Sequence, residues 1–129
     1  MPVYTIASLE KLTPEQTYKV SEAITDIHCD LTGAPTEFVN VIFMNGQSLA
    51  NNKKVGVIGN VRSGGNRNRE LTDELKHRIH EGVAEVLALS IEQLSMALVG
   101  VPASWGMEGG EILPEPGEEE AWLRRTKAS

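Results

Sequence analysis

Pro2 carries the group with the most unusual chemistry in this sequence. Met1 is normally removed when the second residue is small, and its removal would expose a secondary amine on a rigid ring. An α-amino group has an ordinary pKa of about 7.7 to 8.0, and burial or a nearby cation lowers that pKa. The amine is therefore a candidate base at neutral pH. A proline in second position is also common where it has no function, so that alternative stays open.

Three arginines, Arg62, Arg67 and Arg69, lie in the stretch Val-Arg-Ser-Gly-Gly-Asn-Arg-Asn-Arg. Guanidinium groups bind carboxylates through two parallel hydrogen bonds, the two glycines let the backbone approach a ligand, and the helix start that follows offers N–H groups to an anion. The stretch is a candidate carboxylate clamp, with a solvated turn as the alternative. It lacks the glycine spacing and the Lys-Ser/Thr pair of a nucleotide phosphate loop.

Two further side chains are candidates for proton transfer. Glu108 lies in Trp-Gly-Met-Glu-Gly-Gly-Glu, where glycines allow a carboxylate to enter a cleft, and its alternative is a surface charge. His28 flanks the apolar stripe of an expected helix, where a structural histidine is the more common case. His77 and His80 share a helix face without a third ligand, and the single Cys29 excludes a Cys-rich zinc site. Neither a metal nor an organic cofactor is implied.

The elements that position these residues form two similar halves. Pro2 leads directly into a β-prone segment, and Thr13-Pro14-Glu15-Gln16 has the residues of a capped helix start. The first half predicts a strand over residues 2–8, a helix over about 14–31 that ends before Gly33, and a strand over 38–44. The second half predicts a strand over 55–61, a helical stripe over 71–86 and a strand over 96–99.

The repeated pattern predicts the fold class α/β (α+β). Two tandem β-α-β units would form a four-stranded sheet with both helices on one face, because each crossover has the same hand. The other sheet face also carries apolar residues, so we expect an oligomer that covers it. The chain is predicted to be a single domain over residues 1–129, with repeat one over about 2–44 and repeat two over about 55–99. A loop and tail over about 102–129 would place Trp122 and Leu123 on a neighbouring surface.

Composition excludes several classes of protein. The chain has 129 residues, 40% of them hydrophobic, which suffices for one core. The net charge of -6 and the scattered Lys and Arg residues argue against nucleic acid as a partner. No apolar run approaches the roughly 20 residues of a membrane-spanning helix. We therefore expect a soluble, cytoplasmic protein with no membrane partner.

Several of these features occur together in one order: Pro2, the two β-α-β halves, Ile-Thr-Asp-Ile-His ending at His28, the arginine-bearing loop, and the segment from Glu108 to Ile-Leu-Pro-Glu-Pro-Gly. In this combination the chain resembles the tautomerase superfamily, and within it the cis-3-chloroacrylic acid dehalogenase group. The resemblance extends to about Gly117. It implies a homotrimer of fused β-α-β pairs, a small carboxylate substrate, and catalytic roles for Pro2, His28 and Glu108.

The same resemblance implies that two arginines bind the substrate carboxylate. Arg67 matches the second arginine without gaps, whereas Arg62 matches the first only if the glycine-rich turn holds a two-residue insertion. Which of Arg62, Arg67 and Arg69 bind substrate stays open at this point. The dehalogenase group also has a tyrosine on the fourth strand, where this sequence has Ala97. The missing phenol removes a hydrogen-bonding partner from hydration chemistry.

Three functions follow from these residues. The first is keto–enol tautomerisation of a 2-oxo or 2-hydroxy-2-enoic acid, with neutral Pro2 moving the proton. The second is addition of water to an unsaturated acid such as a 3-haloacrylate, with protonated Pro2 as the acid and with His28 and Glu108 activating water. The third is a partner-binding protein that retains the scaffold without catalysis.

Overall fold

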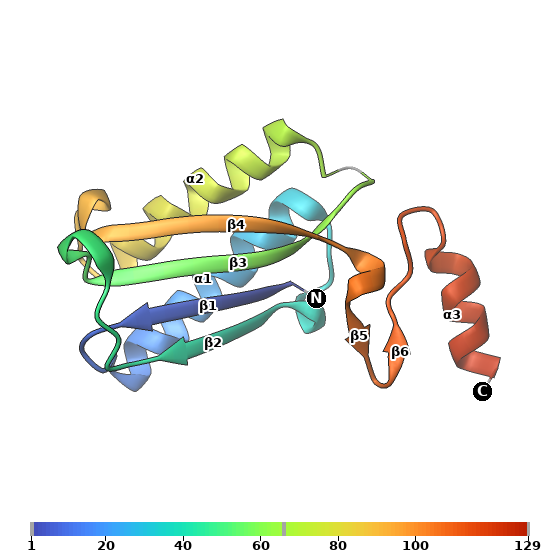
Figure 1. Ribbon diagram of the computed structural model, residues 1–129, viewed down its shortest axis with the longest axis horizontal. Coiled ribbons are helices and arrows are strands. Elements are labelled where there is room, and N and C mark those ends of the chain that lie inside the picture. Colours follow the sequence, from blue (N-terminus) through green and yellow to red (C-terminus); the bar gives the residue numbers. More distant parts are fainter. Residues whose placement is uncertain (1, 66, 129) are drawn as a thin grey trace.

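Two β-α-β units lie side by side in this computed structural model, which describes residues 2–65 and 67–128, with side chains as far as Arg124 (Figure 1). Their strands are β1 (Val3–Ser8), β2 (Asn40–Met44), β3 (Val55–Ser63) and β4 (Leu94–Pro102). β1 pairs in parallel with β2, and β3 pairs in parallel with β4. The antiparallel pair of β1 and β3 forms the centre of the order β2-β1-β3-β4. The predicted fold class is confirmed.

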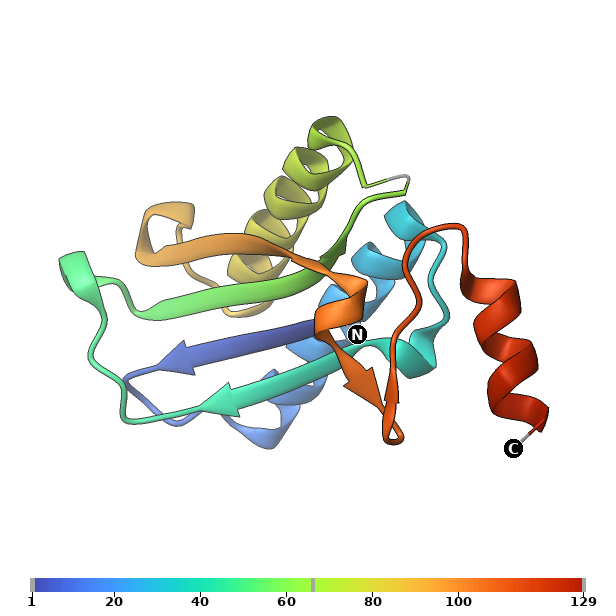
Figure 2. The same ribbon diagram turned by 45° about the vertical axis from the view of Figure 1, so that its right-hand side comes forward.

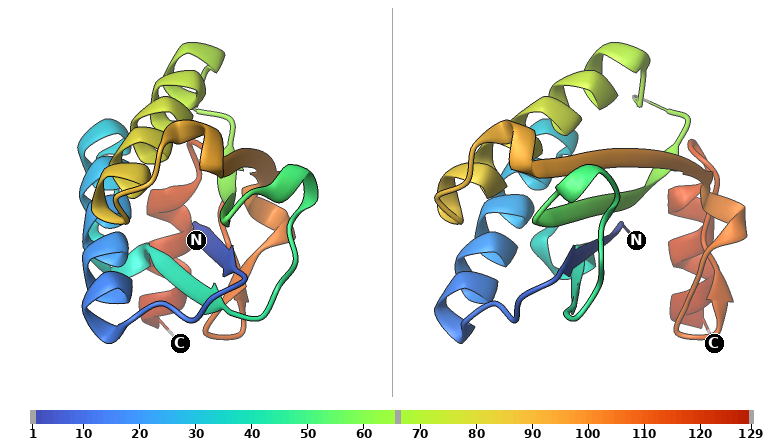
Figure 3. Two further views of the ribbon diagram at one scale, coloured as in Figure 1. Left: turned by 90° about the vertical axis from the view of Figure 1, so that its left-hand side faces the viewer. Right: turned by 60° about the vertical axis from the view of Figure 1, so that its left-hand side comes forward.

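Helices α1 (Pro14–Thr32) and α2 (Arg69–Val86) pack together on one face of the sheet (Figure 3). Side chains alternate across each strand, so Tyr4, Ile6 and Ser8 of β1 are buried against the helices. The core is built from this strand face and the facing helix stripes, and its most buried aliphatic members are Ile6, Val20, Ile24, Val57, Val61, Leu75, Ile79, Val83 and Leu94. This shared core holds α1 in place against β1.

Local signals set the ends of α1. The Thr13 side chain accepts a hydrogen bond from the Gln16 N–H at 3.1 Å, and the Gln16 side chain accepts one from the Thr13 N–H at 2.9 Å. This reciprocal pair is the predicted capping box. Gly33 ends the helix with φ of 75°, and its N–H donates to the Cys29 carbonyl. The helix therefore ends one residue beyond the predicted range of 14–31.

The strands differ from the predicted ranges at their ends. β2 begins at Asn40 because Thr36–Phe38 form a 3₁₀ turn, after which the Asn40 N–H donates to the Pro2 carbonyl at 3.1 Å. β3 and β4 are longer than predicted because their ladder continues past the apolar runs, pairing Arg62 with Val101. This extension carries Arg62 to the end of the sheet at which β1 begins.

The C-terminal segment has more structure than the predicted loop and tail. It contains the hairpin β5 (Met107–Glu108) and β6 (Glu111–Ile112), followed by helix α3 (Glu119–Ala128). Gly109 and Gly110 form the hairpin turn with φ of 58° and 81°. The hairpin and α3 lie beyond the sheet, at the end where the N-terminus emerges (Figures 1 and 2).

The sheet face opposite the helices is open. Ile42, Ile58 and Val99 lie on it with about half of their surface exposed, each from a different strand. Separately, no helix within residues 2–65 and 67–128 is long and apolar enough to cross a bilayer.

Candidate active site

A pocket of about 440 Å³ lies at the end of the sheet where β1 begins. One wall comes from the C-terminal end of α1 and the turn that follows it, including Gly33 and Phe38. The opposite wall comes from the hairpin and α3, including Trp122. Arg62 and Arg67 lie between these walls, and the second wall contributes Glu108 and Glu119, so the charged groups of the pocket are of both signs.

Two of the three candidate arginines share this pocket. The charge of Arg62, after the larger effect of burial, lowers the pKa of Arg67, so the two guanidinium groups are electrostatic neighbours. Arg62 Nη1 lies 3.5 Å from Glu119 Oε1. Arg69 instead has a side chain that is 95% exposed and forms an ion pair with Asp73 on α2. The structure therefore separates Arg69 from the pocket.

His28 lies behind the pocket wall, bonded to Tyr4. Its Nδ1 is 2.7 Å from the Tyr4 hydroxyl, and only 2% of the residue is exposed. Burial, with a smaller effect from the Arg67 cation, lowers the pKa of His28 to about 4, while burial raises the pKa of Tyr4. Both partners are therefore neutral at pH 7. Among the described residues, the second imidazole nitrogen, Nε2, is buried without a hydrogen-bond partner.

Pro2 is fully buried at the start of β1. Its carbonyl accepts hydrogen bonds from the Asn40 backbone N–H at 3.1 Å and from the Asn40 side chain at 3.4 Å. The antiparallel register pairs Val3 with Asn60, so Pro2 lies at the end of β3 that carries Arg62. Pro2 is thus fixed by the sheet at the pocket end of the molecule.

The glycine-rich turn contacts the C-terminal segment. Gly64 and Gly65 have φ of 91° and 60°, and a Cβ at either would lie 3.1 to 3.2 Å from Pro116. The close approach predicted from these glycines is therefore to the chain itself. Their turn positions Arg67, whose N–H donates to the Gly64 carbonyl at 3.0 Å. Opposite it, Glu115 accepts a hydrogen bond from the Ser104 N–H at 2.7 Å.

The predicted site residues thus divide into two groups. Arg62, Arg67 and Glu108 line the pocket, whereas Pro2 and His28 are buried at the same end of the sheet without lining it. Ala97 lies elsewhere, on the open face of β4 opposite Ile58.

The positions of Tyr4 and Glu119 were not predicted from the sequence, and Trp122 was predicted only to lie on a neighbouring surface, not in the pocket. Tyr4 shares the strand face of Pro2, and that shared face was the one available signal for it. Glu119 and Trp122 follow a Gly-Pro-Glu-rich stretch that predicts a loop, and only the fold shows that they return to the pocket. The Trp122 indole Nε1 donates to the Ile112 carbonyl at 2.8 Å, which anchors α3 on the hairpin.

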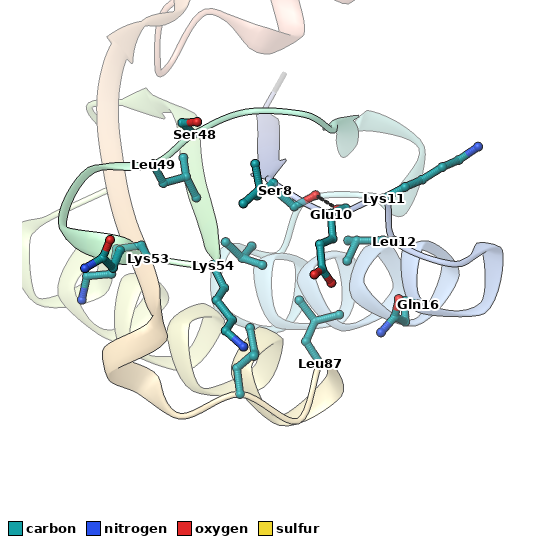
Figure 4. Close-up of a pocket in the computed structure, with 14 residues that line it drawn as sticks. Ser8, Glu10, Lys11, Leu12, Gln16, Ser48, Leu49, Lys53, Lys54 and Leu87 are labelled. Carbon is teal, nitrogen blue, oxygen red and sulfur yellow. Dashed lines mark hydrogen bonds between the residues drawn. The ribbon is translucent and has the colours of Figure 1, made fainter.

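A second cavity, of about 510 Å³, lies at the other end of the sheet (Figure 4). The segment after β1, the segment before β3 and the C-terminal end of α2 line it, and they contribute Glu10, Lys54 and Leu87. None of the predicted site residues belongs to this cavity. In the part of the chain that the structure describes, no group of three or more His, Cys, Asp or Glu side chains could hold a metal ion.

Solved structures resemble this one over nearly the whole chain. N1, a member of the cis-3-chloroacrylic acid dehalogenase family, is 29% identical with a TM-score of 0.80, covering 95% of this chain and 90% of that one. The native fused 4-OT is 16% identical with a TM-score of 0.76, covering 95% and 99%. Macrophage migration inhibitory factor of Toxoplasma gondii is 14% identical with a TM-score of 0.66, covering 83% and 96%. The last two show the fold alone.

No protein-family model matches the chain, and no curated protein matches it significantly. The structural match to N1 nevertheless confirms the family resemblance noted from the residues.

Proposed function

We propose that this chain, a member of the tautomerase superfamily, is an enzyme that interconverts the enol and keto forms of a small 2-oxo acid. The observation that carries the proposal is the pocket that joins Arg62, Arg67 and Glu108 at the end of the sheet where Pro2 is buried. Removal of Met1 gives Pro2 a free secondary amine. Two guanidinium groups then bind the substrate carboxylate, and the amine is the only base that the mechanism needs.

The proton moves in two steps. Neutral Pro2 takes the proton from the enol hydroxyl of a 2-hydroxy-2-enoic acid, and the ammonium form then delivers it to C3 as the C2 carbonyl forms. Burial disfavours the charged form of an amine, which supports the neutral form that the first step needs. The arginines hold the substrate carboxylate so that the enol group faces the Pro2 amine, and this fixed orientation accelerates the proton transfer.

The Tyr4–His28 hydrogen bond favours tautomerisation over addition of water. In the hydratase alternative His28 activates water together with Glu108, but the His28 Nδ1 is already bonded to the Tyr4 hydroxyl. Ala97 also lacks the phenol that the dehalogenase group has on this strand. Tautomerisation needs neither group to touch substrate. In the proposed mechanism Tyr4 and His28 instead support the wall behind the amine as a neutral pair.

Ketonisation of a 2-hydroxy-2-enoic acid, followed by ultraviolet absorbance, tests the proposal. Wild type should accelerate the reaction. Pro2→Ala should lose about a hundredfold in kcat/KM, because its primary amine is no longer held in place by a ring and the positioning of the base is lost. Mass spectrometry must first verify that Met1 is absent, since a retained residue makes the proline nitrogen an amide. Equal rates for the two proteins would overturn the proposal and leave the partner-binding alternative.

Two further assays separate the enzymatic alternatives. Release of halide from cis-3-haloacrylate at a rate that matches ketonisation would favour the hydratase alternative. 2-Oxo-3-pentynoate, which inactivates the structural relative Pt0534, provides a label for the amine. The Pro2 nitrogen should add to its alkyne and increase the mass of wild type by one inhibitor. Pro2→Ala, whose amine is not held by a ring, should be labelled more slowly at that position.

We also infer a homotrimer assembled through the open sheet face. Ile42, Ile58 and Val99 expose about half of their surface there, and burying them would be favourable. One fused 4-OT structure is a symmetric trimer with the same fold, at 17% identity.

A further inference from the structure

Helix α3 closes the pocket on the side away from α1, and its residues differ in chemistry from the arginines. Trp122 and Leu123 line the pocket together with Leu113, Pro114 and Phe38. Glu119 lies one turn before them, at 3.5 Å from Arg62. The helix thus brings an apolar wall and a carboxylate to the same opening.

The pocket is larger than a three-carbon acid requires. Propanoate or acrylate has five non-hydrogen atoms, and five water molecules occupy about 150 Å³. The pocket measures about 440 Å³. The charged lining side chains are Arg62, Arg67, Glu108 and Glu119, and apolar side chains make up much of the remaining lining, so space is available for an apolar group.

We propose that α3 determines substrate specificity: Glu119 competes with the substrate carboxylate for Arg62, and Trp122 and Leu123 contact an apolar substituent of the substrate. The preferred substrate is a monocarboxylic 2-oxo acid or its enol with an alkyl or aryl group of several carbons at C3. A three-carbon acid leaves the wall uncovered. This inference extends the proposed function, since it names the class of acid that the same pocket accepts.

The charge balance supports a monocarboxylate. Arg62 pairs with Glu119, and its cation also lowers the pKa of Glu115 and of Glu119 as a lesser effect after their hydrogen bonds. A substrate carboxylate at Arg62 displaces a carboxylate that is already there. A second carboxylate on the substrate would face the carboxylates that surround this arginine and be repelled.

Binding of unreactive acids tests this inference independently of catalysis. Propanoate and hexanoate differ by three methylenes, and each buried methylene contributes about fourfold in affinity (0.8 kcal/mol). The indole N–H signals of Trp122 and Trp105 in an NMR titration report the two dissociation constants. Hexanoate should bind at least about tenfold more tightly than propanoate and shift the Trp122 signal. Equal affinities for the two acids would overturn the inference.

Variants of Trp122 and Leu123 distinguish direct contact with the bound acid from a merely structural role of these side chains. Trp122→Ala should reduce the preference for hexanoate to about threefold or less, chiefly by weakening the binding of hexanoate. Leu123→Ala should reduce the preference in part, and it serves as a second variant if Trp122→Ala does not fold. Trp105→Ala is the matched control because Trp105 is 79% exposed and outside the pocket. An equal loss of affinity for both acids in Trp122→Ala would contradict a specific apolar contact.

The competing carboxylate has its own variant. Glu119→Gln should tighten both acids by about two- to fivefold, the range expected for loss of one exposed ion pair. Glu120→Gln removes a neighbouring exposed charge and should change nothing. Weaker binding in Glu119→Gln would mean that Glu119 orients Arg62, and would overturn the competition. The outcomes stay separate from the proposed function, because Pro2→Ala should keep the hexanoate preference while losing ketonisation.

Discussion

The hydrogen-bonded pair of Tyr4 and His28 is buried behind the pocket, and burial keeps the His28 imidazole neutral at pH 7. Two neutral side chains share one hydrogen bond of 2.7 Å, and the Arg67 cation acts on both of them. A protonated imidazole there would add a second positive charge near Arg67 in a buried region, which burial and Coulomb repulsion both oppose. His28 therefore links the stability of the fold to pH.

We expect wild type to lose stability as the pH falls from 6.5 to 4. The pKa of His28 is about 4 in the folded chain against 6.5 as its ordinary value. Within that window the unfolded chain binds more protons than the folded one, so the free energy of unfolding falls with pH, by up to about 3 kcal/mol for this residue. Urea denaturation at several pH values measures the effect.

The variant His28→Gln separates this effect from carboxylate titration. It should be less stable than wild type at pH 7 and lose less stability on acidification. His77→Gln is the matched control, because His77 is 65% exposed on α2 and should leave the wild-type slope unchanged. A slope in His28→Gln equal to that of wild type would exclude His28 as the source.

At the residue scale, sequence reasoning selected groups with distinctive chemistry in segments marked by glycines or by a strand end. Three of them, Arg62, Arg67 and Glu108, line one pocket. Their roles in catalysis stay predictions. The Tyr4–His28 bond could not be predicted, since its partners are 24 residues apart and their contact depends on how α1 packs on β1.

At the scale of elements, a glycine in β3 makes room for Tyr4. A Cβ on Gly59 would lie 2.6 Å from both Tyr4 Cε1 and Leu98 Cδ2, well inside van der Waals contact. The Tyr4 ring occupies the space that any other residue at position 59 would need. The central strand pair β1 and β3 therefore depends on this glycine.

Gly59→Ala should displace the Tyr4 ring and destabilise the fold by about 1 to 3 kcal/mol, as overpacking typically does. Gly100→Ala on β4 is the control, because its Cβ would lie 3.4 Å from Ser63 Cβ, at the edge of ordinary contact. Urea denaturation compares the two variants. Equal stability of Gly59→Ala and Gly100→Ala would show that the sheet adjusts without moving Tyr4.

Elements with strong local signals were predicted closely. The capping box at Thr13 and the left-handed Gly33 delimit α1 to within one residue. The hairpin β5–β6 and α3 were not predicted, because two-residue strands have no periodicity to detect. α3 begins in a run of glutamates, and its contact with the pocket lies outside local sequence.

At the scale of the whole molecule, the open sheet face predicts assembly. Ile58→Lys places a charge at the centre of this face and should convert the expected trimer to a monomer, because a buried unpaired charge is costly. Sedimentation equilibrium measures the mass. Ile91→Lys is the control, since Ile91 is 48% exposed in the turn before β4, outside the strands of the sheet. A monomeric wild type would contradict the inferred trimer.

The antiparallel pairing of β1 with β3 gives the duplicated halves an approximate dyad, and the two cavities are counterparts under it. One lies beside the C-terminal end of α1, at Gly33, and the other beside that of α2, at Leu87. The two halves differ in the basicity of the nitrogen at which their first strand begins. A strand that starts within the chain begins with a peptide nitrogen, whose lone pair is delocalised into the carbonyl. Duplication therefore yields one reactive centre per chain, and the stoichiometry of covalent labelling should be one.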